Sequence, residues 1–197
     1  MESLAQSGIF FNTVHGPKRI DRAREKRYNH FNTKHLREES EMSVEKAKKY
    51  LASVGLADRV IEPEASTATV PLAAAALGVD EGMIAKTLSF IVNERPILIL
   101  AAGTARIDNR KYKDLFHTKA RMVPFESCEE LIGHAAGGVC PFGVNEGIRV
   151  YLDETLRQFD FVYPAAGNDH SGVRLTPDEL ARAVGGAEWV DVCKMPE

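Results

Sequence analysis

The sequence lacks the long apolar segments that a membrane protein or a secretory leader requires. No hydrophobic run approaches the roughly 20 residues of a transmembrane helix. The N-terminus has neither the apolar core nor the small-residue cleavage site of a signal peptide. We therefore expect a protein of the cytoplasm with no membrane partner.

Cysteine is scarce, and its placement argues against disulfides and metal. The chain has three cysteines, Cys128, Cys140 and Cys193, an odd number without the spacing of a disulfide framework. The order Cys128, His134, Cys140 does not reproduce the short Cys-x-x-Cys pairs of structural zinc sites. We expect reduced thiols, no metal site and no organic cofactor.

An excess of positive charge is also missing. The formal net charge is −3, which argues against strong non-specific binding to nucleic acid, because such binding depends on neutralising phosphates. A protein of this charge that acts on RNA needs a local basic patch or help from another protein. One candidate patch surrounds residues 108–116, although a solvated helix face explains it equally well. Its members are Arg106, Arg110, Lys111, Lys113, Lys119 and Arg121.

The common catalytic signatures are absent. There is no Ser-His-Asp triad, no His-Glu-x-x-His, no P-loop and no Rossmann fingerprint. What the chain has is the composition of an ordinary globular protein, 44% hydrophobic and 27% charged. Its 197 residues are enough for one domain with a substantial core.

The first forty-one residues differ from the rest. Met1–Glu41 combines many basic residues with Tyr28, Phe31 and three histidines, and its helical periodicity is weak. A basic arm that stacks on unpaired tRNA bases fits this composition, and so does a poorly ordered terminal appendage. We expect a poorly ordered extension over 1–41 and one domain over 42–197, whose first helix Ser43 would cap.

Alternating strand and helix signals predict a single α/β domain with a mixed, twisted sheet and surrounding helices. The apolar runs 86–92 and 96–102 flank a turn at 93–95 and predict a hairpin, which argues against an all-parallel sheet. Other strands are expected at 59–62, 121–123, 148–152, 161–163 and 189–192. Helices are expected at 43–54, 71–77, 108–116, 127–132 and 176–184, the last two opened by capping boxes.

The segment Ala136-Gly137-Gly138-Val139-Cys140-Pro141-Phe142-Gly143 is the strongest candidate for a binding loop. Paired glycines let the backbone turn tightly and approach a ligand without an intervening Cβ, and Pro141 fixes the exit direction. A plain Gly-Pro turn between a helix and a strand explains the same residues, and spacing alone favours it.

Three segments together resemble one known family. They are Ile84-Ala85-Lys86-Thr87-Leu88, the glycine loop, and Ala166-Gly167-Asn168-Asp169-His170-Ser171. This order is that of the YbaK/ProX family, whose loop reads Gly-Gly-Val/Ile-Ser-Pro-Phe/Leu-Gly and which comprises free-standing aminoacyl-tRNA deacylases and the editing domain of bacterial prolyl-tRNA synthetases. The resemblance covers about 44–192 and implies a YbaK-like fold and hydrolysis of mischarged aminoacyl-tRNA.

The resemblance also implies roles for individual residues. Lys86 and Gly138 are expected to be catalytic, the lysine by anchoring the terminal adenosine or stabilising charge on the attacked carbonyl, and the glycine backbone by polarising that carbonyl. An edge lysine extended to solvent and an ordinary Asn-Asp turn at 168–171 are the alternatives. The residues expected to bind substrate are Ser66, Thr67, Gly137, Val139, Cys140, Asn168, Asp169, His170 and Ser171.

Two positions depart from the family pattern. Cys140 stands where the family has serine, so a thiol nucleophile has to be considered, although the nearby bases His134 and His170 lack an evident orienting partner. Gly172 stands where the deacylases of Cys-tRNA(Pro) carry an aspartate. The resemblance further implies hydrolysis without a dedicated protein base, assisted by a hydroxyl of the substrate.

The sequence thus predicts a deacylase that clears a mischarged small amino acid, Ala, Ser, Thr or Cys, from tRNA. Its partner would be the 3′ acceptor end of aminoacyl-tRNA, with an aminoacyl-tRNA synthetase as a second candidate. One alternative is a non-catalytic module that binds tRNA or a synthetase. Another is a Cys140 thiol hydrolase acting on a different acyl ester.

Overall fold

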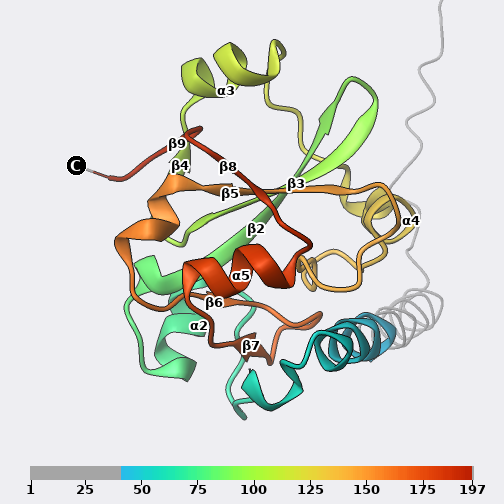
Figure 1. The fold of residues 1–197 in the computed structure, drawn as a ribbon, viewed down its shortest axis with the longest axis vertical. Helices are drawn as coiled ribbons and strands as arrows, with labels where there is room; N and C mark the ends of the chain where they lie inside the picture. The colour runs from blue at the N-terminus through green and yellow to red at the C-terminus, as the bar shows by residue number, and fades with distance from the viewer. Residues whose placement is uncertain (1–40, 197) are drawn as a thin grey trace, which may run out of the picture. The chain divides into compact units, whose positions relative to one another are not determined.

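A mixed five-stranded sheet organises the part of the chain that the computed structural model describes, residues 41–196 (Figure 1). The extension predicted over 1–41 lies, except for its last residue, outside that range. The strand order is β6-β2-β3-β5-β8, with β2 and β3 antiparallel and the other neighbours parallel, so the predicted mixed α/β fold is confirmed. The bounds are β2 Ile84–Val92, β3 Arg95–Ala102, β5 Arg149–Asp153, β6 Tyr163–Pro164 and β8 Glu188–Val190.

The β2–β3 hairpin forms the centre of this sheet. Its turn residues Asn93 and Glu94 have positive φ values of 49° and 62°, as a tight two-residue hairpin turn requires. Residues 97–102 of β3 are all buried, because elements cover both faces of the sheet.

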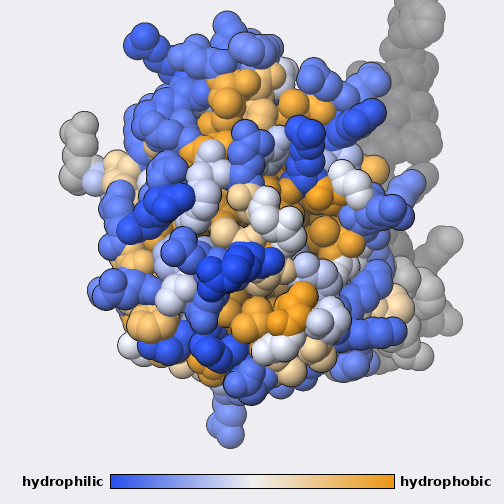
Figure 2. All heavy atoms as spheres, viewed as in Figure 1, coloured by the Kyte–Doolittle hydropathy of each residue, from blue (hydrophilic) through white to orange (hydrophobic). Residues whose placement is uncertain are grey.

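Helices pack on opposite faces of the sheet. The first helix, described over residues 41–53, and α5 (Pro177–Ala183) pack on one face through a core that includes Leu51, Leu100 and Leu180. On the other face α3 (Asn109–Phe116) inserts Tyr112, whose ring centroid lies 5.2 Å from that of Phe90. On the side that Figure 2 shows, hydrophobic surface is broken into patches between hydrophilic residues.

Local capping signals locate three helix starts. Thr69 caps α2 (Val70–Leu77) and Asp108 caps α3, each by accepting hydrogen bonds from first-turn amides. At α5, the Thr176 hydroxyl accepts from the Glu179 amide while the Glu179 carboxylate accepts from the Thr176 amide, which completes the predicted capping box.

Two other cap predictions are wrong. The first helix already includes residues 41 and 42, and the Ser43 hydroxyl instead accepts a hydrogen bond from the Ala135 amide at 3.1 Å. Ser127 makes no side-chain cap bond, because a 3-10 turn over Phe125–Ser127 runs directly into α4 (Cys128–Ile132). Both serines have the local sequence of a helix cap, but the contacts of the folded chain prevent each side chain from capping its helix.

Short strands complete the described fold. One small antiparallel sheet joins β1 (Val60–Ile61) to β7 (Gly172–Val173), and another joins β4 (Arg106–Ile107) to β9 (Cys193–Lys194). The strand predicted at 121–123 is reduced to a single bridge between Met122 and Phe90. Within residues 41–196, the helices are too short or too polar to cross a membrane.

A buried carboxylate, Asp153, fastens β5 to the C-terminal segment. One of its oxygens accepts from the Thr155 amide at 3.0 Å and the Thr155 hydroxyl at 2.7 Å. The other accepts from the amides of Val192 at 2.9 Å and Cys193 at 3.0 Å. Burying a charge is costly unless it is hydrogen-bonded, and these four bonds stabilise the carboxylate.

We expect Asp153→Ala to lower the free energy of unfolding by about 2–5 kcal/mol, because each buried donor that loses its partner costs roughly 1–3 kcal/mol. Urea unfolding followed by circular dichroism measures the loss. Asp114→Ala is the control, since this exposed aspartate forms only a 3.9 Å surface pair with Arg110, which is worth about 0.5 kcal/mol or less. Equal losses in the two variants would contradict the role assigned to Asp153.

Candidate functional site

The outer edge of β2 is paired at its two ends and open between them. β6 pairs with Ile84 and Ala85, and the segment 121–123 bonds to Ser89 and Ile91 at 3.1 and 2.8 Å. Among the strands that the structure describes, none pairs with residues 86–88 on this edge. Because alternate residues of a strand direct their backbone groups to the same edge, the N–H and C=O of Thr87 face the opening.

A cavity of about 130 Å³ lies at this opening. Its walls come from β2, the loop leading into α2, the glycine loop and the segment 163–171. Lys86 and Thr87 line it together with Gly137 and Val139, which lie about fifty residues later in the chain. The fold thus places the candidate lysine and the glycine loop on one cavity.

The Lys86 side chain is held in place by backbone carbonyls. Its ammonium donates to the carbonyl of Gly103 at 2.8 Å and to that of Ala105. Partial burial lowers the pKa of Lys86 from its usual value, since desolvation disfavours the charged form. An ammonium has three N–H donors, so one remains for a ligand.

Two hydroxyls in the cavity wall lack partners. Thr67 Oγ1 and Thr87 Oγ1 are buried, and neither has a hydrogen-bond partner among the described residues. Buried polar groups in proteins nearly always have a partner, so both hydroxyls are suited to bind a polar ligand. The sequence analysis did not single out Thr87. Successive side chains of a strand point to opposite faces, so Thr87 approaches the cavity from the face of β2 opposite to that of Lys86.

Gly138 has a packing role. A Cβ on this residue would lie 2.4 Å from the carbonyl oxygen of Gly167, so the loop 166–171 lies directly against the glycine backbone. The Gly138 N–H donates to the Ala135 carbonyl at 3.0 Å and is not available to polarise a substrate carbonyl. Within the described residues, the amides of Gly137 and Val139 have no such acceptor, so these two amides of the loop remain open to a ligand.

Cys140 belongs to the glycine loop, but its side chain is buried in the core and does not line the cavity. Its exposure is 0%, and its Sγ lies 3.6 Å from the Phe142 carbonyl oxygen and 3.7 Å from His134 Nε2. Burial raises the pKa of Cys140 to about 12 and lowers that of His134. A protonated, inaccessible thiol is a poor nucleophile, so the structure contradicts both the pocket-lining and the nucleophile interpretations.

The loop 166–171 supports the other cavity wall. The Asp169 carbonyl accepts hydrogen bonds from the Thr67 amide at 2.5 Å and the Ser66 hydroxyl at 3.4 Å, which holds the Thr67 side chain at the cavity. Ser171 also lines the cavity, and its hydroxyl accepts from an amide of its own loop at 3.1 Å.

The polar side chains of the same loop lie outside the cavity lining. His170 Nδ1 is 2.9 Å from Asp169 Oδ1, and the His170 amide donates to Asn168 Oδ1 at 3.0 Å. These contacts shape the turn, and Asn168, Asp169 and His170, which the sequence analysis expected to bind substrate, do not line the cavity.

We expect Gly138→Ala to displace the loop 166–171, because its Cβ would collide with backbone rather than with a flexible side chain. Overpacking of this kind costs about 1–3 kcal/mol. Gly137→Ala is the matched control, since its Cβ would meet open space and only its φ of 91° is strained. Amide NMR shifts of residues 166–171 should move in the first variant alone, and unmoved shifts there would contradict the packing role.

Comparison with known proteins identifies the family. The model of the aminoacyl-tRNA editing domain matches residues 64–183, more than half of the chain. The uncharacterized protein YwhH of Bacillus subtilis is 43% identical over 154 residues, which are 78% of this chain and 98% of that protein. The proline–tRNA ligase of Streptococcus sanguinis is 29% identical over 71% of this chain, but the match spans only 22% of the ligase.

A solved structure supports the same assignment. It was proposed to be a trans-editing enzyme for prolyl tRNA synthetase, and it superposes with a TM-score of 0.70 at 35% identity over 77% of this chain and 97% of its own. Fold and sequence therefore agree, and the chain belongs to the family of YbaK-like aminoacyl-tRNA editing domains.

Proposed function

We propose that this protein hydrolyses the ester of a mischarged aminoacyl-tRNA in trans, in the cytoplasm, and that its substrate carries Ala, Ser, Thr or Cys. The observation that carries the proposal is the cavity at the β2 edge. Lys86, the unpartnered hydroxyls of Thr67 and Thr87, and two residues of the glycine loop, Gly137 and Val139, line this one cavity. Membership of the editing family supports the reaction class.

The size and lining of the cavity support a small amino acid. Its volume of about 130 Å³ is below the roughly 300–1,000 Å³ of pockets for drug-sized ligands. Thr67, Thr87 and Ser171 place hydroxyls around it, which suits an ammonium or a small polar side chain. An apolar ligand would leave these hydroxyls without a hydrogen-bond partner and would therefore bind more weakly.

The reaction needs a placed water and a stabilised oxyanion. Water attacks the ester carbonyl carbon, the bond from that carbon to the ribose oxygen breaks, and a proton from the water passes to the leaving oxygen. The Lys86 ammonium and the amides of Gly137 and Val139 would stabilise the negative charge that develops on the carbonyl oxygen. The cavity lining contains no Asp, Glu, His or Cys, so we infer that a hydroxyl of the substrate assists the proton transfer.

A non-catalytic module that binds tRNA or a synthetase is the second candidate. One observation favours it: two of the three Lys86 donors already bond to carbonyls. A protein of this kind would bind aminoacyl-tRNA without releasing the amino acid.

We expect Lys86→Met to lower the rate of amino-acid release by about 10²–10³, the usual effect of removing one donor to an oxyanion. The measurement is release of labelled amino acid from a panel of tRNAs mischarged with Ala, Ser, Thr or Cys. Lys49→Met, on the exposed side of the first helix, is the control and should hydrolyse normally. Undiminished release by the Lys86 variant would remove this residue from the mechanism, and no release by the wild type from any tRNA would favour the non-catalytic module.

We expect Cys140→Ser to keep hydrolysis, because the buried thiol does not reach the cavity. The same release assay measures this. If the folded variant released amino acid about 10³-fold or more slowly, a loss of the size seen when a nucleophile is removed, the thiol hydrolase interpretation would be favoured instead.

A further inference from the structure

We propose that a second pocket, next to the small cavity, binds the purine base of the tRNA's terminal adenosine. This inference rests on the proposed function, because it divides one substrate between two adjoining spaces. The small cavity takes the aminoacyl group and the second pocket takes the base.

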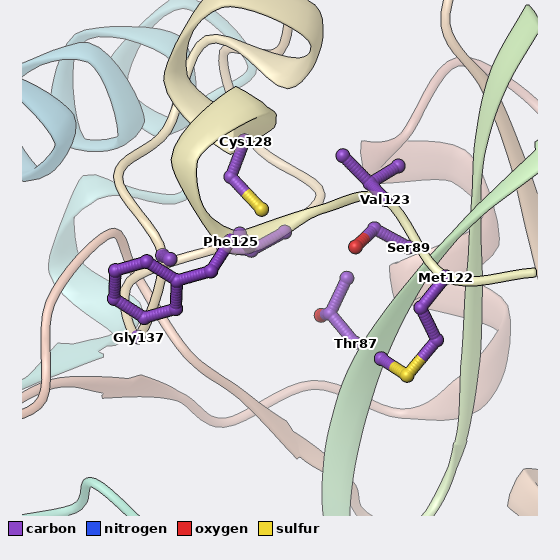
Figure 3. A pocket seen from close by; sticks show the side chains of 9 residues that line it. Thr87, Ser89, Met122, Val123, Phe125, Cys128 and Gly137 are labelled. Carbon is purple, nitrogen blue, oxygen red and sulfur yellow. The ribbon is translucent and has the colours of Figure 1, made fainter. Parts of the chain in front are cut away.

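The second pocket adjoins the first. It has a volume of about 330 Å³ and shares Thr87, Gly137 and Val139 with the small cavity. Figure 3 shows Thr87, Met122 and Phe125 among the side chains that line it. In aminoacyl-tRNA one ribose carries both the ester and the base. The site of the base can therefore be no farther from the aminoacyl site than one ribose ring spans. A pocket that shares a wall with that site meets this requirement.

The two pockets differ in the chemistry of the side chains that line them. Every side chain that lines the larger one is uncharged, whereas Lys86 and several hydroxyls line the smaller. An uncharged, mainly apolar pocket is a poor place for a phosphate or an ammonium, since it offers no partner for their charge. It suits a neutral ring with a few polar edges, for which Ser89 and Cys128 supply polar atoms.

Two exposed side chains at the rim fit a planar ring. Phe125 is 67% exposed and Met122 is 58% exposed, unusual for large apolar groups that make up a pocket wall. Stacking of a base on an aromatic ring contributes about 1–3 kcal/mol, and a Met thioether makes favourable contacts with aromatic rings. Arg121, exposed beside Met122, could contact the preceding phosphate, while Glu126 beside Phe125 opposes it.

The test uses an acceptor-stem RNA whose terminal adenine is replaced by fluorescent 2-aminopurine. Stacking on Phe125 should quench its fluorescence when the full-length protein binds. Phe125→Ala and Met122→Ala should lose the quenching and raise the KM for deacylation about tenfold, equivalent to about 1.4 kcal/mol of binding, with little change in kcat. Leu115→Ala, an apolar residue on α3 that is 44% exposed, is the matched control.

The outcomes separate this inference from the proposed function. Quenching by wild-type protein that releases no amino acid would retain the base pocket and overturn the deacylase. Normal hydrolysis with KM and fluorescence unchanged in both variants would overturn the base pocket alone. A dimer of the wild-type protein in sedimentation experiments would also overturn the base pocket if Phe125→Ala dissociated it and left the quenching unchanged. The rim would then bind a second copy of the chain.

Discussion

The site depends on a break in the pairing of one strand. β2 is held by β6 at one end and by the segment 121–123 at the other, and the residues between them keep a free edge. Backbone groups at a free edge need partners, so this part of β2 is available to bind a ligand. Gly137 and Val139 of the glycine loop line the cavity at this break, and the missing side chain of Gly137 leaves room there.

The sequence predicts much of the fold because many of its signals act locally. Thr69, Asp108 and Thr176 cap helices through bonds to amides two or three residues away, so the pattern of a few neighbours is sufficient. Ser43 and Ser127 carry the same signal, but Ser43 lies inside its helix and Ser127 makes no side-chain cap bond. The 3-10 turn that includes Ser127 belongs to the packing of the folded chain, as does the helix that continues through Ser43.

The candidate site could be predicted only in outline. Lys86 and the glycine loop stand out in the sequence, and the fold gives them a common cavity. What the sequence could not give is the direction of each group: Gly138 bonds to Ala135, Cys140 is buried behind the loop, and Thr87 has an unpartnered hydroxyl. These directions depend on how the loop packs in the folded chain, as where the Gly138 backbone lies against Gly167 of a separate loop.

The contact of Gly138 with Gly167 affects how such a domain can be re-engineered. At Gly138 the two loops touch through backbone atoms, so no side chain at this point could adjust to a new partner. A chimera that takes residues 136–143 from a relative while keeping 166–171 would join surfaces that were shaped separately. The two loops therefore form a single module, and an exchange of substrate preference between relatives has to transplant them together.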